Sequence, residues 1–305
     1  VCVADAAELA AAQAARELEV DRFYTNYMDA LEDESVDAVC IASPTFTHAQ
    51  IAVAAAEAGK HVFCEKPMAV TLDEADRMIE AAESAGIRLQ IGFMRRFDQG
   101  FREAKRLIQD GAIGDLVLIK STGRGPGLPG SWYLDFDKSN GLLAEVNSHD
   151  FDTVRWLSGS EFSRVYAEAG AFARPDIKNE YPGFFDSALV SIRLTDGKMA
   201  VIDGTCPSNY GYDARTEVLG THGVLMIGQF EEQSVVISRK DGTLRPTTPS
   251  WRNRFKDAYR EEMAHFVRCI IDGTNPDVTG LDGKKALEGV LAANRSLKEG
   301  RPVCL

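Results

Sequence analysis

The chain has 305 residues, of which 45% are hydrophobic and 26% are charged. This length allows two medium-sized domains that each bury an apolar core, and no stretch approaches the roughly 20 apolar residues that span a bilayer. The formal net charge of -12, with Lys and Arg scattered along the chain, argues against nucleic acid or an anionic membrane as a partner. We expect a soluble protein that acts on a small uncharged molecule.

The cysteines lie far apart in the sequence, at positions 2, 40, 64, 206, 269 and 304. They form no C-x-x-C pair or similar short spacing, so we expect no structural zinc. Cys2, Cys40 and Cys64 fall within apolar strand-like runs, where a reduced thiol packs as a small hydrophobe, and this favours a cytoplasmic protein. The chain begins at Val1, already in a strand-like run, so the sequence leaves the presence of a signal segment open.

In the first third of the chain, β-branched runs alternate with Ala- and Glu-rich segments, which is typical of βαβ units on a parallel sheet. We expect strands at 1–5, 36–43, 61–65 and 88–93, and helices at 6–18, 47–58 and 72–85. The strands are continuous apolar runs, as in a sheet that helices cover on both faces. This part of the sequence predicts a doubly wound α/β domain.

After a predicted helix at 99–110, the pattern changes to longer strands with turn signals at Asp196-Gly197, Tyr210-Gly211 and Asp241-Gly242. These signals predict an antiparallel sheet. A loop rich in Gly and Pro at 123–130 is followed by predicted helices at 142–157, 255–271 and 283–298. We place the domain boundary near Lys120, which gives an α/β domain at 1–120 and an α+β domain at 121–305.

Asp5 ends the first predicted strand. In a dinucleotide-binding sheet, an acidic residue at the end of the second strand binds the adenosine ribose and repels the 2′-phosphate of NADP. At that position Asp5 selects NAD, although a role in capping the following helix fits the spacing equally well.

The glycine-rich G-x-G-x-x-G loop, which normally lies about 20 residues before this acidic residue, does not occur upstream of Asp5. The alternatives are a first strand, loop and helix that precede Val1, or a protein that binds no dinucleotide in the usual way. We favour the first, because a sheet that starts at Val1 would leave an apolar strand edge exposed.

The segment Cys64-Glu65-Lys66-Pro67 directly follows a predicted buried strand, and Ala42-Ser43-Pro44-Thr45 and Thr47-His48 precede it. In their order and spacing, these segments resemble the Gfo/Idh/MocA family of dehydrogenases.

Gly141-Leu142-Leu143-Ala144-Glu145, followed by His149-Asp150-Phe151-Asp152 and Arg155-Trp156-Leu157, resembles the family helix that bears a carboxylate and a histidine four residues apart. Within the family, Gly92-Phe93-Met94-Arg95-Arg96-Phe97-Asp98 and Tyr210-Gly211-Tyr212-Asp213 are most similar to inositol 2-dehydrogenases. The resemblance covers essentially the whole chain.

The resemblance implies an N-terminal Rossmann domain and a C-terminal α+β domain on a large open, mainly antiparallel sheet, whose exposed face commonly mediates dimer or tetramer assembly. It implies NAD-dependent oxidation of a secondary hydroxyl on a cyclic polyol. It also implies that Lys66 is catalytic and precedes a proline that is often cis. The cofactor-binding residues implied are Asp5, Ser43, Pro44, Thr45, His48, Glu65 and Lys66.

Oxidation of a secondary alcohol needs a base for the hydroxyl proton and a group that stabilises the developing alkoxide. On one predicted helix, Glu145 and His149 project from the same face. His149, whose ordinary pKa is about 6.5, is our predicted base, and the Lys66 cation lowers the pKa of the hydroxyl. Glu145 orients His149 and balances its charge. The family carboxylate is usually aspartate, so the substrate pocket is expected to differ here.

Arg95, Tyr210 and Tyr212 are predicted substrate contacts, because an uncharged polyol is bound through many hydrogen bonds. Trp132 and Tyr133, beside the glycine-rich loop, either form a lid, reach a neighbouring subunit or pack against the core.

The sequence allows three alternatives to the oxidation of an inositol by a metal-free enzyme. The substrate is an aldose, anhydrosugar or glycoside instead of an inositol, or the protein is a non-catalytic regulatory protein that binds nucleotides. The third is a metal site formed by residues 145, 149 and 152, which would need further ligands that the sequence does not offer, so we predict no metal.

Overall fold

The computed structural model describes residues 1–128, 130–229 and 236–305. The chain divides into two compact units. The first comprises Val1–Gly92 and His265–Leu281, and the second comprises Phe93–Ala264 and Asp282–Leu305.

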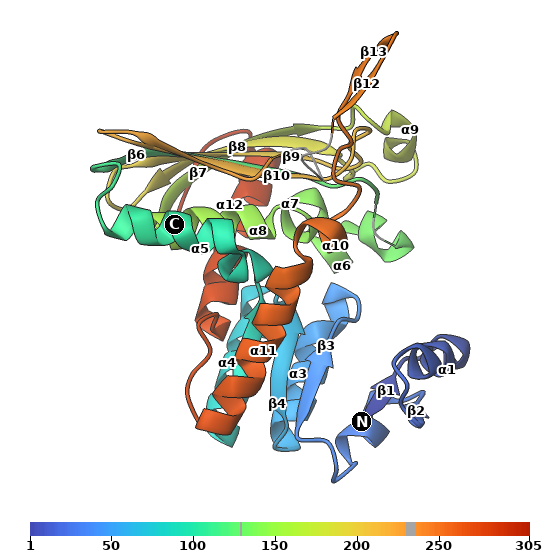
Figure 1. The fold of residues 1–305 in the computed structure, drawn as a ribbon. Helices are drawn as coiled ribbons and strands as arrows, with labels where there is room; N and C mark the ends of the chain where they lie inside the picture. Colours follow the sequence, from blue (N-terminus) through green and yellow to red (C-terminus); the bar gives the residue numbers. More distant parts are fainter. Residues whose placement is uncertain (129, 230–235) are drawn as a thin grey trace. The chain divides into compact units, whose positions relative to one another are not determined.

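The first unit contains two small parallel sheets (Figure 1). One pairs β1 (Cys2–Ala4) with β2 (Arg22–Tyr24), and the other has the order β3 (Ala38–Ile41), β4 (His61–Glu65), β5 (Leu89–Gly92). Its helical elements are α1 (Glu8–Glu17), α2 (Tyr27–Leu31), η1 (Thr45–Thr47), α3 (His48–Glu57), α4 (Leu72–Ala85) and the later part of α11 (Lys256–Asp272).

Local signals explain how well these elements were predicted. Helix α4 has the predicted bounds, because Thr71 and Glu74 form a capping box at its start and Gly86 adopts a left-handed conformation at its end. Strand β2 and helix α2 were not predicted, since both are short and β2 is mostly exposed. Cys40 is exposed, contrary to the prediction of a fully buried strand, because β3 is an edge strand of its sheet.

The second unit is built on a seven-stranded sheet with the order β11-β10-β6-β9-β8-β7-β14. Its strands are β6 (Leu116–Arg124), β7 (Phe162–Gly170), β8 (Ser187–Leu194), β9 (Met199–Thr205), β10 (Asp213–Gly220), β11 (Val224–Ile227) and β14 (Val303–Cys304). Strands β6 and β9 run parallel, and the other neighbours pair antiparallel. The prediction of a large, mainly antiparallel sheet is confirmed.

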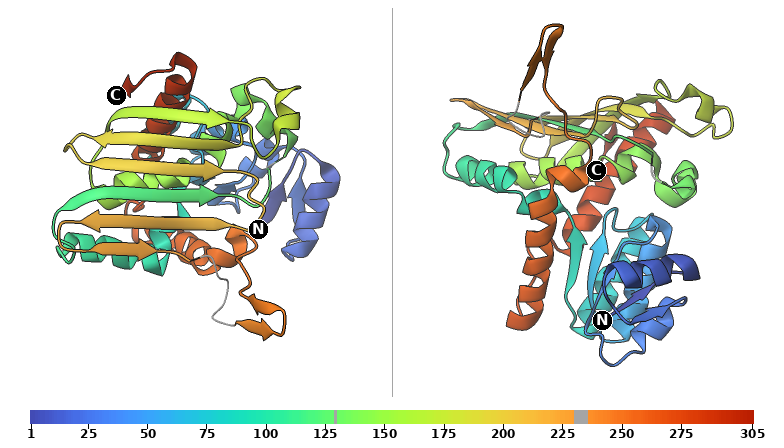
Figure 2. Two further views of the ribbon diagram at one scale, coloured as in Figure 1. Left: turned by 90° about the horizontal axis from the view of Figure 1, so that it is seen from above. Right: turned by 45° about the vertical axis from the view of Figure 1, so that its right-hand side comes forward.

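Helices of the second unit pack on one face of this sheet (Figures 1 and 2). Its helical elements are η2 (Met94–Phe97), α5 (Gln99–Gln109), η3 (Ser131–Leu134), α6 (Phe136–Ser139), α7 (Gly141–Glu145), α8 (Ser148–Ser158), α9 (Pro175–Lys178), α10 (Trp251–Arg254), the start of α11, and most of α12 (Gly280–Glu299). Strands β12 (Ile237–Arg239) and β13 (Gly242–Leu244) form a separate hairpin at the predicted Asp241-Gly242 turn. No helix in the described ranges has the length and hydropathy of a membrane span.

The unit boundary lies at Phe93 and not near Lys120, the boundary expected from the change in sequence pattern. The reason is that α5 packs against α8 and β11 and therefore belongs with the large sheet. The first unit also includes residues far along the chain, since Phe266 packs edge-on against Phe63 with ring centroids 5.9 Å apart.

Candidate active site

The carboxyl ends of β3, β4 and β5 bring several predicted cofactor residues to one edge of their sheet. Ser43 follows β3, Glu65 ends β4, and Lys66 comes directly after it. Glu65 lies opposite Gly92 in the β4–β5 pairing, and a Cβ at Gly92 would stand only 3.1 Å from the Glu65 carboxyl group. Because ligands bind at this edge of parallel α/β sheets, these residues occupy the expected position for a nucleotide site.

Main-chain geometry around Lys66 is fixed by His48. The His48 side chain is buried, with Nδ1 2.8 Å from the Pro67 carbonyl oxygen and Nε2 2.8 Å from that of Ser43. The Lys66–Pro67 peptide bond is cis, as the family resemblance implied. Burial lowers the pKa of His48, and the two carbonyl contacts oppose this shift. His48 therefore contacts the loops that follow β3 and β4 through both ring nitrogens.

The Glu65 carboxylate also contacts this loop, since its Oε2 accepts a hydrogen bond from the Lys66 N–H at 3.1 Å. Burial raises the pKa of Glu65, and the adjacent Lys66 charge opposes that shift. On the other sheet, Asp5 follows β1 with an exposed side chain whose Oδ1 accepts from the Ala7 N–H at 2.8 Å. Ala7 itself is the N-cap of α1, so Asp5 stabilises the turn before the helix while its carboxylate stays exposed to solvent.

In the second unit, Glu145 and His149 do not lie on one continuous helix, and that prediction is wrong. Helix α7 ends at Glu145 and α8 begins at Ser148, and between them the Asn147 N–H donates to the Leu142 carbonyl oxygen, five residues earlier, at 3.2 Å. Only 9% of Glu145 and 6% of His149 is exposed, so both side chains are buried. The Phe93 ring packs edge-on against the His149 ring, with centroids 5.9 Å apart.

Two of the predicted substrate contacts have protein partners in the interior. Arg95 is only 2% exposed, and its guanidinium bonds Asp150 at 2.7 Å and also interacts with the Tyr212 hydroxyl. Burial raises the pKa of Tyr212, whose ring packs against two aromatic rings of the same unit. Tyr210 is more exposed; its hydroxyl donates to Asp213 at 2.7 Å and accepts from an arginine. A direct role in substrate binding stays a prediction for all three.

Tyr133 is only 2% exposed, so it packs in the interior, which was one of the alternatives considered for the residues beside the glycine-rich loop. Trp132, its neighbour in η3, is partly exposed. Burial raises the pKa of the Tyr133 hydroxyl well above its ordinary value, and the nearby acidic groups of Cys206 and Glu145 oppose its ionisation further.

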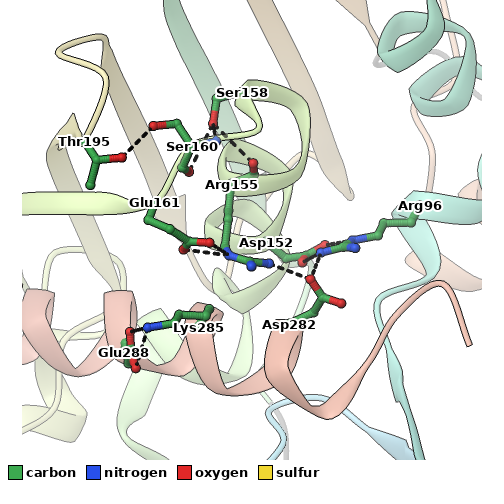
Figure 3. A network of polar contacts seen from close by, with 10 residues as sticks. All are labelled: Arg96, Asp152, Arg155, Ser158, Ser160, Glu161, Thr195, Asp282, Lys285 and Glu288. Atoms are coloured by element: carbon green, nitrogen blue, oxygen red, sulfur yellow. Dashed lines mark hydrogen bonds and ion pairs between the residues drawn. The ribbon is translucent and has the colours of Figure 1, made fainter. Parts of the chain in front are cut away.

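A network of ion pairs connects Asp152 and Arg155 of α8 to neighbouring segments of the second unit (Figure 3). Arg96 binds Asp152 through two nitrogens, at 2.5 and 3.0 Å, and also bonds Asp282 at 3.0 Å. Arg155 bonds the same Asp282 at 2.5 Å and pairs with Glu161. Asp152 is thus part of an ion-pair network. Among the described residues, no group of three or more His, Cys, Asp or Glu side chains is placed to hold a metal ion.

Comparison with known families and proteins places these features in context. The family model for oxidoreductases with an NAD-binding Rossmann fold, Gfo/Idh/MocA, matches residues 1–93, and the model of its C-terminal domain matches residues 101–226. The scyllo-inositol 2-dehydrogenase (NAD(+)) of Bacillus subtilis is 36% identical over 305 residues, which are all of this chain and 88% of that protein. This chain belongs to the Gfo/Idh/MocA family.

Other members of the Gfo/Idh/MocA family are similar over nearly the same length. The myo-inositol 2-dehydrogenase of Thermotoga maritima is 36% identical over 289 residues, which cover 94% of this chain and 85% of that protein. A crystal structure of scyllo-inositol dehydrogenase from Lactobacillus casei with bound NAD(H) and scyllo-inositol has a TM-score of 0.92 and 30% identity. The match covers all of this chain and 91% of that one, so the Rossmann and α+β architecture is confirmed.

Asn147 and Asp150 are residues whose importance the sequence did not indicate. Both are fully buried beside His149, and Asp150 accepts hydrogen bonds from three side chains. Asp150 lies within a motif that carries the family resemblance. The motif alone does not show whether Asp150 or His149 turns its side chain toward the sheet.

Proposed function

We propose that this protein oxidises a secondary hydroxyl of an inositol-like cyclic polyol to a ketone, with NAD as the hydride acceptor. The observation that carries the proposal is made on this chain, a member of the Gfo/Idh/MocA family. Lys66 follows a strand at the sheet edge where ligands bind, and Glu145 and His149 are buried. The names of the relatives support the substrate class, since three of them are inositol dehydrogenases.

The first unit offers a suitable site for NAD. Asp5 presents an exposed carboxylate at a strand end, which fits a ribose diol and repels a 2′-phosphate. The other residues that would hold the cofactor follow β3 and β4, and they are Ser43, Pro44, Thr45, Glu65 and Lys66. His48 supports this site by contacting both loops. When bound, NAD supplies the carbon that accepts the hydride.

The protein's own residues handle the proton. His149 takes the proton of the substrate hydroxyl, and the Lys66 ammonium group donates a hydrogen bond to the same oxygen and stabilises its negative charge. Both His149 and Glu145 are almost fully buried, and we propose that the Glu145 carboxylate orients the imidazole. Since only the neutral imidazole can take a proton, turnover should rise with pH as His149 loses its own proton.

A substrate panel tests the proposal. The full-length protein is incubated with NAD and myo-inositol, scyllo-inositol, aldoses, anhydrosugars or glycosides, and NADH absorbance is followed. We expect turnover of at least one inositol. Turnover of a sugar alone would favour the aldose, anhydrosugar or glycoside alternative, and binding of NAD without turnover of any substrate would favour a regulatory protein.

We also propose that the protein forms a homodimer or homotetramer through the open face of the seven-stranded sheet. In Figure 2 the strands of this face are seen without a covering helix from the described residues. It exposes large apolar side chains, which include Leu189, Met199, Leu219, Val224 and Met226. Apolar surface of this kind is typical of protein interfaces. Light scattering should give a multiple of the chain mass, and Leu189→Glu should reduce it.

The cysteines support a proposal of cytoplasmic localisation. The six cysteines, all within the described residues, form no disulfide, and Cys64, Cys206 and Cys269 are buried. Such thiols persist in a reducing compartment. A fluorescent fusion followed by cell fractionation would test the assignment, and recovery from outside the cytoplasm would contradict it.

A further inference from the structure

The residues on either side of His149, at the start of helix α8, pack against two glycines of the sheet. Gly123 of β6 and Gly204 of β9 lie opposite each other in the parallel pairing of these strands. A Cβ at Gly204 would collide with Oδ1 of Asn147, and a Cβ at Gly123 would collide with Oδ2 of Asp150. The two glycines therefore leave the space that these two buried side chains occupy.

Hydrogen bonds hold both side chains in this space. Asn147 donates through Nδ2 to the Gly123 carbonyl oxygen at 3.2 Å and to Asp150 Oδ2 at 2.8 Å. Asp150 Oδ1 accepts from the Ser121 hydroxyl at 2.6 Å and from Arg95 at 2.7 Å. These bonds join α8 to β6 and to the segment that follows Phe93.

A buried ion pair restricts the position of the Asp150 side chain. The Asp150 carboxylate is fully buried, and Arg95 is its cationic partner. Burial lowers the pKa of Arg95, but the Asp150 charge more than offsets this and keeps the guanidinium protonated. A buried ion pair with additional hydrogen bonds is costly to break from either side, so it permits few alternative orientations of the helix start.

The main chain of the first turn of α8 connects these two side chains to His149. The carbonyl oxygen of Asn147 accepts the first helical hydrogen bonds of α8, from the N–H groups of Asp150 at 2.8 Å and Phe151 at 3.0 Å. His149 lies between the two anchored residues. We propose that Asn147 and Asp150, seated on Gly123 and Gly204, are positioning residues that fix the direction of the His149 imidazole. This inference rests on the proposed role of His149 as the base.

The test uses variants that alter this support without touching the cofactor residues. Gly204→Ala adds the Cβ that would displace Asn147, and Asn147→Ala removes the anchoring amide. We expect kcat for the inositol substrate to fall about 10- to 100-fold in each, since small misplacements of catalytic groups have effects of this size. The Kd for NAD should stay within about twofold of the wild-type value, because a loss confined to catalysis leaves ground-state binding unchanged.

The double variant Asn147→Ala with Gly204→Ala should be no slower than Asn147→Ala alone, because the added methyl group enters vacated space. Gly183→Ala is the matched control, since a Cβ there meets only one atom, at 3.9 Å. It should leave kcat unchanged. A purely structural role would lower the melting temperature of Asn147→Ala but leave kcat and the pH profile unchanged, and that result would overturn the proposal.

A readout without turnover separates this inference from the proposed function. The His149 imidazole is titrated by NMR in wild type, Asn147→Ala and Gly183→Ala, with its signals assigned from a His149→Asn variant. We expect shifted signals and a changed titration midpoint only in Asn147→Ala. Unchanged His149 signals would overturn the inference even if the enzyme oxidises inositol. Changed signals in a protein that oxidises no polyol would overturn only the proposed function.

Discussion

Replacement of Arg96 by methionine should destabilise the second unit strongly. Arg96 is 8% exposed and Asp152 only 1%, and Arg96 binds both oxygens of that carboxylate. Methionine keeps much of the apolar volume but leaves Asp152 buried without its bidentate partner, whereas Asp282 keeps its bond to Arg155. Removal of one member of a buried ion pair costs about 3–5 kcal/mol. For a unit of this size, that corresponds to a fall in melting temperature of about 6–20 °C.

Arg106→Met is the matched control. Arg106 also pairs with two carboxylates, those of Glu103 and Asp110, but all three side chains are more than half exposed. Exposed pairs of this kind contribute little to stability because solvent screens them, so this variant should melt close to wild type. Tryptophan fluorescence is the appropriate probe, because the three tryptophans, at positions 132, 156 and 251, all lie in the second unit.

The pH dependence of the melting temperature provides a second test of the Arg96→Met prediction. Burial raises the pKa of Asp152, and the Arg96 charge opposes this shift, so removal of Arg96 raises that pKa further. A carboxyl group with a raised pKa in the folded state destabilises the fold when ionised, and this penalty disappears as the pH falls through the folded-state pKa. The deficit of Arg96→Met should therefore be smaller at mildly acidic than at mildly alkaline pH. Equal melting temperatures for Arg96→Met and Arg106→Met, or a deficit that grows on acidification, would refute the reasoning.

Three substitutions test the proposed catalytic and binding residues. Lys66→Met should lower kcat for inositol by at least about 100-fold with an unchanged melting temperature, since the lost charge acts mainly on the transition state; an unchanged kcat would remove Lys66 from the mechanism. Asp5→Ser should increase kcat/KM with NADP relative to NAD by about tenfold or more, because the 2′-phosphate is no longer repelled, whereas a constant ratio would leave Asp5 only its bond to Ala7. Glu145→Asp should change the ratio of kcat/KM for scyllo- and myo-inositol, because the shorter chain withdraws the carboxylate; the same ratio would show that this position does not affect specificity.

The sequence predicted the elements whose signals are local. Helix α4 and strand β4 have the predicted bounds, because one carries a capping box and the other is a short buried apolar run between polar residues. The parallel pairing of β6 with β9 was not predicted, since it joins strands far apart in the sequence and leaves no trace in local patterns. For the same reason, the unit boundary was placed too late.

The sequence offered candidate site residues, whose roles stay predictions, but it did not indicate their geometry. The sequence did not indicate the helix break between Glu145 and His149, nor the glycine pair beside Asn147 that only the folded sheet brings together. Arg95 was expected to contact the substrate because an uncharged polyol is bound through many hydrogen bonds, and that role stays a prediction. Its burial follows from the pairing with Asp150, a contact between residues 55 positions apart that no spacing rule indicates.

The most direct test of the central claim follows the hydride itself. The full-length protein is incubated with NAD and an inositol that carries deuterium on its ring carbons, and both products are analysed by mass spectrometry. If a secondary hydroxyl is oxidised by hydride transfer, the reduced cofactor gains a single deuterium and the inositol becomes a ketone that has lost the same deuterium. Reduced cofactor without deuterium, or an inositol recovered unchanged beside intact NAD, would contradict the account.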